Sequence, residues 1–298
     1  LDKKIPTKYK KNIKKQIKNY EVHVYEYLPN ENLKSFIKAN ALIEDLLKKN
    51  FNRSDTLIAA GGGIIGDFAG FVASILKRGV NFINLPSTLL AQVDSSIGGK
   101  TGVNSMKGKN LIGSFYQPKI VISEIGLLKS LSRRNLICGF AEILKHSLIH
   151  DNNFFKFLNK NAENIIEKID THIIRNVITK SCKIKLHFVN KDEKEKNKRM
   201  ILNFGHTFAH GIEAASNYSG KINHGEAVLM GMILATKLSA RKKICSQETL
   251  NKIQSIYEIN NLPRNLKAFF SKKGLDKVVD FMKVDKKNYD SKINLILL

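Results

Sequence analysis

Two histidines four residues apart could bind one metal ion. The stretch LNFGHTFAHGIE, residues 202–213, contains His206 and His210, which would share one face of a helix. The spacing resembles half of a metalloprotease signature, but no glutamate follows the first histidine. The spacing alone therefore leaves three possibilities open: both histidines bind a metal, one does, or both are hydrogen-bonded residues of the core.

A third histidine and a carboxylate extend this set. His224 precedes a glycine at the start of a predicted helix, in NHGEAVLMGM. Glu142 lies three residues before Lys145 in GFAEILKHSLIHD, a spacing that alone is typical of a weak ion pair on a helix surface. Two imidazoles and one carboxylate, however, are a ligand set of catalytic zinc sites, because three protein ligands leave one position open for water or substrate.

A glycine-rich segment predicts a dinucleotide site. AAGGGIIGDFAG follows a predicted strand, and its Gly61, Gly63 and Gly66 match G-x-G-x-x-G. Such glycines let a pyrophosphate approach the N–H groups of a helix N-terminus, although a tight turn without a ligand would look the same. The usual acidic residue about 20 positions on is missing from residues 81–90, and Asp67 follows at once instead. The pattern favours a dinucleotide that is held in an unusual way.

Hydroxyls, glycines and lysines gather in the next segments. LPSTLLAQVDSSIGGKTGVN, residues 85–104, and GKNLIG, residues 108–113, include Lys100 and Lys109. Backbone donors and point charges of this kind suit a phosphate. A glycine-rich hairpin with solvated lysines is the alternative.

The elements that must position these residues change in type along the chain. Strands and helices alternate in the first part, which predicts a mainly parallel sheet. We expect strands at 21–27, 56–60 and 81–86 and helices at 32–49 and 68–76. After residue 128 we expect helices at 132–149, 152–168, 171–189, 200–216, 224–241 and 247–258. This pattern predicts an α/β domain over residues 1–127 and an all-α domain over residues 128–298, with the active site in the cleft between them.

Composition excludes several classes of protein. The 298 residues carry a formal charge of +24, but lysines are spread along the whole chain and arginines are scarce, which disfavours a nucleic-acid-binding surface. The longest apolar runs, such as the strand-like INLILL at 293–298, are far shorter than the roughly 18 residues of a membrane span. Three scattered cysteines, Cys138, Cys182 and Cys245, indicate a reducing compartment, which we expect to be the cytoplasm. The ends suggest a sequence truncated at both termini.

Longer strings of residues resemble one known family. The chain resembles the 3-dehydroquinate synthases of the sugar-phosphate cyclase superfamily, with Ser87 where the family usually has threonine and Ala209 where it often has glycine. The matching strings are GGGIIGDFAGFVAS, RGVNFINLPSTLLAQVDSSIGGKTGVN, GKNLIGSFYQP, AEILKHSLI, RMILNFGHTFAHGIEAA, NHGEAVLMGM and DKK at 285–287.

The resemblance implies a fold and a reaction. The fold is an α/β NAD-binding domain, here without its N-terminal strand, followed by a helical domain. The reaction cyclises a heptulosonate phosphate to 3-dehydroquinate and releases phosphate, in the route to the aromatic amino acids. NAD oxidises a hydroxyl of the substrate and is later regenerated, so that it is not consumed.

The resemblance also implies roles for particular residues. Glu142, His206 and His224 match the metal ligands, with zinc the usual ion and cobalt an alternative, whereas His210 matches a residue beside the substrate. The positions that match phosphate contacts are Lys100, Asn110 and Arg78, the last reaching from the neighbouring subunit of a homodimer. Those that match contacts to the carboxylate and hydroxyls are Lys145, Lys185, Arg199, Asn203, Lys286 and Asp94. Those that match NAD contacts are Gly62, Gly63, Asp67, Ser87, Thr88, Lys109, Glu31, Lys34 and Asp2, the last at the adenosine ribose.

Four alternatives remain open at this point. Another sugar-phosphate cyclase would share the glycines and metal ligands but would not need cations for a substrate carboxylate. A metal- and NAD-dependent alcohol dehydrogenase would consume NAD and need no phosphate site. A nucleic-acid-binding protein would show steep salt dependence and no metal requirement. An inactive copy of the enzyme is favoured only by the truncation, because the metal and catalytic positions are filled.

Overall fold

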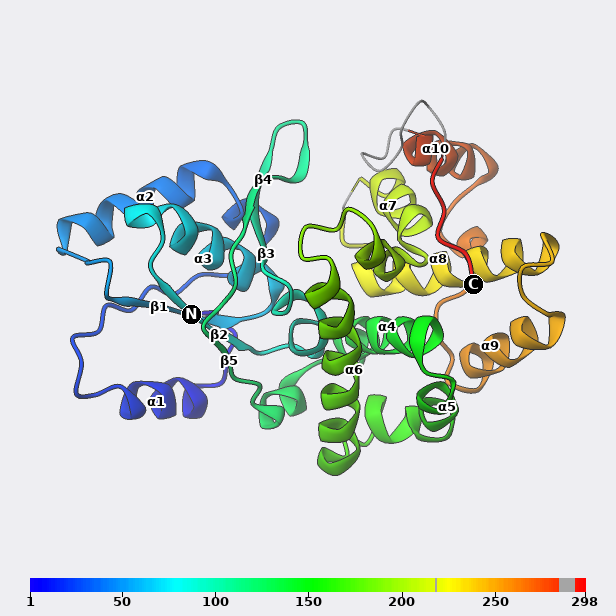
Figure 1. Ribbon diagram of the computed structural model, residues 1–298, viewed down its shortest axis with the longest axis horizontal. Helices are drawn as coiled ribbons and strands as arrows, with labels where there is room; N and C mark the ends of the chain where they lie inside the picture. The colour runs from blue at the N-terminus through cyan, green and yellow to red at the C-terminus, as the bar shows by residue number, and fades with distance from the viewer. Residues whose placement is uncertain (218, 284–292) are drawn as a thin grey trace. The chain divides into compact units, whose positions relative to one another are not determined.

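The computed structural model describes residues 1–217, 219–283 and 293–298. The chain forms two compact units, Leu1–Leu136 and Ile137–Leu298. Their boundary falls in the first turn of helix α4, Arg133–His150 (Figure 1).

A small parallel sheet lies at the centre of the first unit. Strand β1, Thr56–Gly61, pairs with β2, Asn81–Pro86, which pairs with β5, Ile120–Val121, and both pairings are parallel. Alternate residues of β2 are buried, as its period of two requires. Strands β3, Lys100–Ser105, and β4, Gly108–Phe115, form a separate antiparallel hairpin.

Helix α3, Gly63–Ile75, packs on this sheet and on the hairpin. Its apolar residues are buried almost all round, Phe68, Phe71 and Val72 among them, because the helix is enclosed on more than one face. The remaining helical elements of the unit are α1 (Thr7–Gln16), η1 (Glu31–Leu33), α2 (Phe36–Lys48), η2 (Leu76–Arg78), the π-helical turn η3 (Ala91–Ser95) and η4 (Ile125–Ser130).

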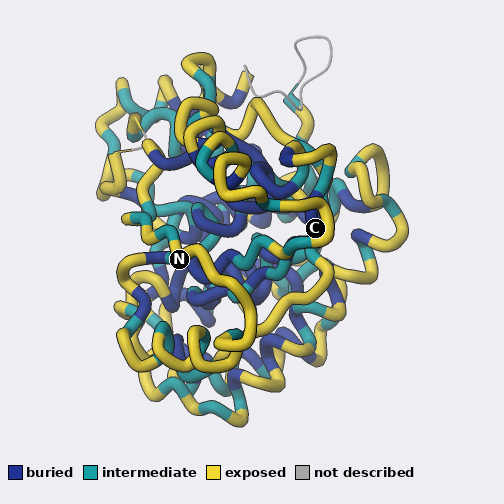
Figure 2. Tube along the Cα trace, turned by 90° about the vertical axis from the view of Figure 1, so that its left-hand side faces the viewer, coloured by how far each residue is buried: buried dark blue, intermediate teal, exposed yellow. Residues whose placement is uncertain are grey.

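The described residues of the second unit form helices and the segments that connect them, with no strand. Its elements after α4 are α5 (Asn152–Ile166), α6 (Thr171–Lys191), η5 (Lys198–Asn203), α7 (His206–Ala215), α8 (His224–Arg241), α9 (Gln247–Ile259), η6 (Leu266–Ala268) and α10 (Lys272–Lys283). Helix α8 is buried along most of its length, whereas many other segments alternate between buried and exposed residues (Figure 2).

Two glycines bring α7 close to α8. Gly205 precedes α7 with a φ of 77°, a left-handed conformation that glycine adopts without strain. A Cβ on Gly231 would lie 2.2 Å from the carbonyl oxygen of Gly205, so only glycine allows this approach. The contact holds the start of α7 against α8, and the ring centroids of His206 and His224 lie 5.5 Å apart.

The predicted fold class, an α/β unit followed by a helical one, is confirmed, but three predicted elements differ. Residues 21–27 form no strand, and only Tyr27 makes a bridge, to Asp2, because no neighbouring strand pairs with the segment and Val22 and Val24 stay exposed. The helix expected at 200–216 is divided by Gly205 into η5 and α7. Residues 293–298 have no regular structure.

None of the helices in the described ranges is long and apolar enough to cross a membrane. The three cysteines form no disulfide.

Candidate active site

Three helices of the second unit converge on Glu142, His206 and His224. Glu142 lies in α4, and the two histidines are the first residues of α7 and α8. Asn223 and Glu226 form a capping box that fixes the start of α8. One ligand atom from each of the three residues lies within 4.8 Å of the others. The side chain of Glu142 is fully buried, while that of His224 is 33% exposed.

The spacing of these atoms matches a shared metal ion. Nε2 of His206 and Nε2 of His224 each lie 3.5 Å from Oε1 of Glu142, longer than the roughly 2.7–3.2 Å of ordinary hydrogen bonds. Two ligands on a tetrahedral zinc ion would be about 3.4 Å apart, given bond lengths near 2.1 Å. The buried Oε1 of Glu142 accepts no hydrogen bond within the described chain, whereas Oε2 is paired with Lys145. The residues therefore fit a divalent ion.

Outer partners orient both imidazoles. Nδ1 of His206 lies 3.3 Å from the carbonyl oxygen of Phe204, and Nδ1 of His224 lies 3.2 Å from a carboxylate oxygen of Glu213. Because a carbonyl or carboxylate oxygen only accepts, each Nδ1–H is the donor and each Nε2 is directed at Glu142. Metal-binding histidines are commonly oriented in this way.

Burial and charge give the three groups different protonation states. Burial raises the pKa of Glu142, but Lys145 and the histidines outweigh it and hold the pKa well below its usual range. Burial and the charge of Lys145 lower the pKa of His206 to about 3. Burial also lowers the pKa of His224, but Glu213 outweighs it and raises the pKa well above the usual value. Without a metal, His206 is thus neutral at pH 7, whereas His224 binds a proton more readily than an ordinary histidine.

Lys145 and His210 lie next to this cluster. Lys145 makes an ion pair with Glu142, and the lysine side chain is only 2% exposed, so the surface ion pair considered from the sequence is wrong. The ring of His210 meets that of His206 edge-on, with centroids 5.7 Å apart. His210 is not in the cluster of ligand atoms that lie within 4.8 Å of one another.

Further polar residues of the second unit are buried. Lys185 in α6 and Arg199 in η5 are both buried, and a guanidinium nitrogen of Arg199 donates to the carbonyl of Glu193. Asn203 donates to Glu195 and lies before Gly205, in η5. It therefore does not share a helix with the histidines, as the unbroken helix 200–216 had implied. Lys286 lies outside the described residues.

The first unit holds the glycine-rich turn. Gly62 is the N-cap of α3 and Gly63 its first residue, and no side chain of the described chain caps this end. A Cβ on Gly63 would lie 2.9 Å from Oγ of Ser95, and one on Gly62 would lie 3.2 Å from Cγ2 of Thr88. The N–H of Ser87 donates to the carbonyl of Gly61. The N-terminus of a helix that follows such a turn is a common binding place for an anion.

Two ion pairs connect the region before α2 with α3 and the hairpin. The ammonium of the buried Lys34 lies 2.6 Å from Asp67 and also bonds to Asn110. Burial raises the pKa of Asp67, and Lys34 offsets only part of the rise. Lys109 pairs with Glu31 at 2.9 Å, and although burial raises the pKa of Glu31, Lys109 and Asn104 outweigh it and lower that pKa.

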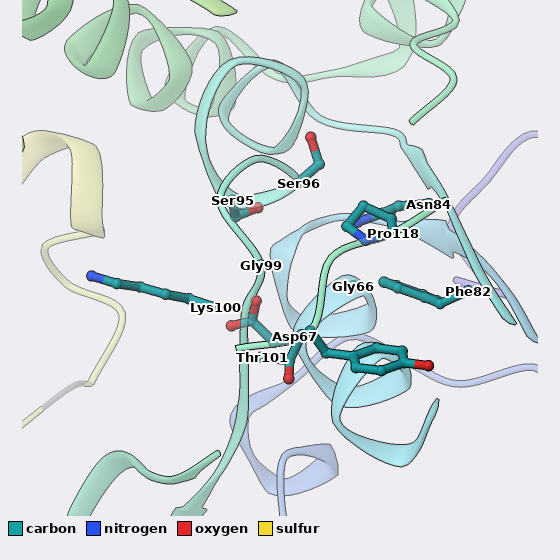
Figure 3. Close-up of a pocket in the computed structure, with 11 residues that line it drawn as sticks. Gly66, Asp67, Phe82, Asn84, Ser95, Ser96, Gly99, Lys100, Thr101 and Pro118 are labelled. Carbon is teal, nitrogen blue, oxygen red and sulfur yellow. The ribbon is translucent and has the colours of Figure 1, made fainter. Parts of the chain in front are cut away.

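Asp67 also lines a small pocket in the first unit, with Asn84, Ser95, Ser96 and Lys100 (Figure 3). In this view the Lys100 side chain extends away from the other labelled residues. Ser95 belongs to the π-helical turn η3, which also contains Asp94. Hydroxyl, amide and carboxylate groups thus meet beside the first turns of α3.

Two further predicted residues, Asp2 and Arg78, lie near the carboxyl end of β1 and after the C-terminus of α3. The N–H of Asp2 donates to the carbonyl of Ala60 at 2.8 Å, so Asp2 lies beside the carboxyl end of β1. Arg78 is exposed and follows the C-terminus of α3, opposite to Gly63. Its φ of 63° and that of Lys77, 50°, form a left-handed turn that is uncommon for these residue types.

Two glutamates of the second unit contact predicted site residues but were not themselves predicted. Glu213 bonds to Nδ1 of His224. Glu195, whose φ is 56°, accepts a hydrogen bond from the side chain of Asn203. Glu213 lies seven residues after His206, hence two turns along the same helix, which was the only signal available. Glu195 stands in a charged stretch that resembles an ordinary loop.

Comparison with known proteins bears on the same residues. The family model described as "3-dehydroquinate synthase N-terminal" matches residues 24–138. The model described as "3-dehydroquinate synthase C-terminal" matches residues 139–288. The chain belongs to the 3-dehydroquinate synthase family. A 3-dehydroquinate synthase of Pelagibacter ubique is 50% identical over 298 residues, which are 100% of this chain and 81% of that relative. The family shows that this chain is an enzyme of that type.

Solved structures of other enzymes share the fold of this chain. A 2-deoxy-scyllo-inosose synthase complexed with carbaglucose-6-phosphate, NAD+ and Co2+ is 27% identical, with a TM-score of 0.84 over 100% of this chain and 81% of that chain. A 2-epi-5-epi-valiolone synthase of Streptomyces hygroscopicus subsp. jinggangensis 5008, with NAD+ and Zn2+ bound, is 24% identical, with a TM-score of 0.85 over 96% of this chain and 80% of that one. The second likeness concerns the fold alone.

Proposed function

We propose that this chain cyclises 3-deoxy-D-arabino-heptulosonate 7-phosphate to 3-dehydroquinate with release of phosphate, and that it uses NAD and a divalent metal ion. The observation that carries the proposal is the Glu142–His206–His224 triangle, in a chain that is 50% identical to a 3-dehydroquinate synthase. Zinc is the ion that this ligand set suits best, and cobalt is the alternative.

Glu142, His206 and His224 would hold the ion. When bound, it would supply Lewis-acid polarisation of a substrate hydroxyl. The ion pair with Lys145 keeps Glu142 ionised, and His206 needs no deprotonation at neutral pH because its pKa is about 3. His210, whose ring contacts that of His206, is assigned to the substrate.

Residues of the first unit would hold NAD, which when bound would accept a hydride from the substrate and later return it. Gly62 and Gly63 leave the N-terminus of α3 open to the pyrophosphate, and Ser87 and Thr88 flank the turn. Asp2, beside the carboxyl end of β1, is assigned to the adenosine ribose. Asp67, Lys109, Glu31 and Lys34 are assigned to the rest of the dinucleotide.

Buried cations support an anionic substrate. Lys145, Lys185 and Arg199 are all buried in the second unit, and such fixed positive charges form strong charge-assisted hydrogen bonds with anions. We assign them, with Asn203 and Lys286, to the carboxylate and hydroxyls, and Asp94 to a hydroxyl. Lys100, Asn110 and Arg78 are assigned to the phosphate. The exposed Arg78 would reach the site of a second subunit, so we expect a homodimer.

A related cyclase reaction is the second candidate, because a 2-deoxy-scyllo-inosose synthase is 27% identical. Its distinguishing feature is a substrate without a carboxylate. The test supplies heptulosonate phosphate, glucose 6-phosphate and sedoheptulose 7-phosphate in turn, with NAD and zinc, and measures phosphate or cyclised product. Only the heptulosonate phosphate should turn over. Turnover of another sugar phosphate at a comparable kcat/KM would contradict the proposed substrate.

A further inference from the structure

Helix α4 carries another buried polar residue one turn after Glu142. Nδ1 of His146 lies 2.6 Å from Oγ of Ser181 in α6, and both side chains are buried, at 0% and 0% exposure. A hydrogen bond in such surroundings is costly to break because water cannot replace the lost partner. The bond therefore connects α4 to α6 at a position where its loss would be costly.

The neighbours of this bond are residues assigned to chemistry. Glu142 lies four positions before His146, and Lys185 lies four positions after Ser181. Residues four apart lie on the same face of a helix. The bond thus connects the face of α4 that carries Glu142 with the face of α6 that carries Lys185. Lys145, adjacent to His146 in the chain, is paired with Glu142.

We propose that His146 is a positioning residue that acts through Ser181. The bond sets the register between α4, with the metal ligand Glu142, and α6, with the substrate-binding Lys185. The inference rests on the proposed function, since both roles come from it. His146 needs no contact with the substrate, because a displacement of about 1 Å at a reacting site can lower the rate about 100-fold.

Three variants test the bond. His146→Phe keeps a ring but removes both nitrogens, Ser181→Ala removes the partner hydroxyl, and His146→Asn keeps an amide nitrogen near the position of Nδ1. We expect the first two to raise the KM for the heptulosonate phosphate about tenfold and to leave the KM for NAD unchanged. His146→Asn should retain most of the wild-type KM. The double variant His146→Phe/Ser181→Ala should be no worse than His146→Phe, because the bond is already lost.

Ser147→Ala is the matched control. Ser147 follows His146 in α4 and is equally buried, but its hydroxyl donates to the carbonyl of Leu144 within the same helix, at 2.7 Å. It should leave both KM values unchanged. The proposal would be overturned if Ser147→Ala raised the KM for the heptulosonate phosphate as much as Ser181→Ala does. It would also be overturned if His146→Phe lowered the Tm without changing that KM.

Metal affinity separates this proposal from the proposed function. Zn2+ affinity, measured by competition with a chelator without substrate, should fall about tenfold in His146→Phe and stay near the wild-type value in His146→Asn and Ser147→Ala. If the wild-type protein forms no dehydroquinate, the proposed function fails. The Zn2+ affinities still test whether His146 sets the register between α4 and α6. Equal Zn2+ affinity in His146→Phe and wild type would then overturn the role of His146.

Discussion

Nδ1 of His224 lies 3.2 Å from a carboxylate oxygen of Glu213, and this contact directs Nε2 of His224 at Glu142. Replacing Glu213 with glutamine keeps the size of the side chain but removes its charge. We expect Glu213→Gln to weaken Zn2+ binding about 10–100-fold, as is usual for the partners of metal-binding histidines. Competition with a chelator measures this. The control is Glu258→Gln, at an exposed glutamate that pairs with Arg264; equal losses in both variants would contradict the account.

The two histidines of α7 should differ in what they bind. His206→Ala removes a proposed ligand, so purified protein should lose its bound metal. His210→Ala should keep the metal and lose rate, because the His210 ring contacts His206 but its nitrogens lie outside the ligand cluster. Metal content by atomic emission and kcat together test the assignment. Equal metal loss in the two variants would show that both histidines are ligands.

The start of α3 should be sensitive to any side chain. In Gly63→Val, the new Cβ would lie 2.9 Å from Oγ of Ser95, and the methyl groups would cover the helix N-terminus. We expect NAD affinity, measured by calorimetry, to fall at least about tenfold because the N–H groups are then shielded. Zn2+ affinity should not change, since the proposed ligands belong to the second unit. Normal NAD affinity would exclude this turn as the pyrophosphate site.

The Lys34–Asp67 pair should give stability a pH dependence. Burial makes the folded pKa of Asp67 higher than its ordinary value of 3.8, so its ionisation costs stability as the pH rises through the folded pKa. Lys34→Met should raise that pKa further. The destabilisation relative to wild type should be near zero below about pH 3.8 and reach about 2–3 kcal/mol above the folded pKa.

Urea unfolding at several pH values measures this difference. Lys109→Met is the control, because Lys109 and Glu31 are 28% and 44% exposed, and an exposed pair contributes about 0–1 kcal/mol. A Lys34→Met destabilisation that does not change with pH would show that Asp67 is not the group responsible.

The sequence predicted those parts of the fold and site that depend on local patterns. Strand β2 was predicted with its observed bounds, because its alternation coincides with one-sided burial and Pro86 ends it. The alternation at 21–27 looks similar, but no strand lies beside it, and pairing is not encoded in the segment itself. Likewise, Gly205 looks like one more residue of the helix predicted at 200–216 until its φ of 77° is known.

The candidate site shows the same limit. Glu142, His206 and His224 were selected by residue type and by resemblance, and the structure brings them together. Glu213 was missed because its contact with His224 depends on how α7 packs on α8, which Gly231 makes possible. The bond between His146 and Ser181 joins residues 35 positions apart, and no local pattern indicates such a pairing.

The stoichiometry of the reaction tests the central claim most directly. Purified protein is mixed with the heptulosonate phosphate, zinc and less than one equivalent of NAD, and phosphate, dehydroquinate and NADH are followed together. We predict one dehydroquinate for each phosphate, many turnovers for each NAD, no accumulation of NADH, and loss of activity on chelation that zinc restores. Accumulation of NADH equal to the product, or full activity after complete removal of the metal, would contradict the account.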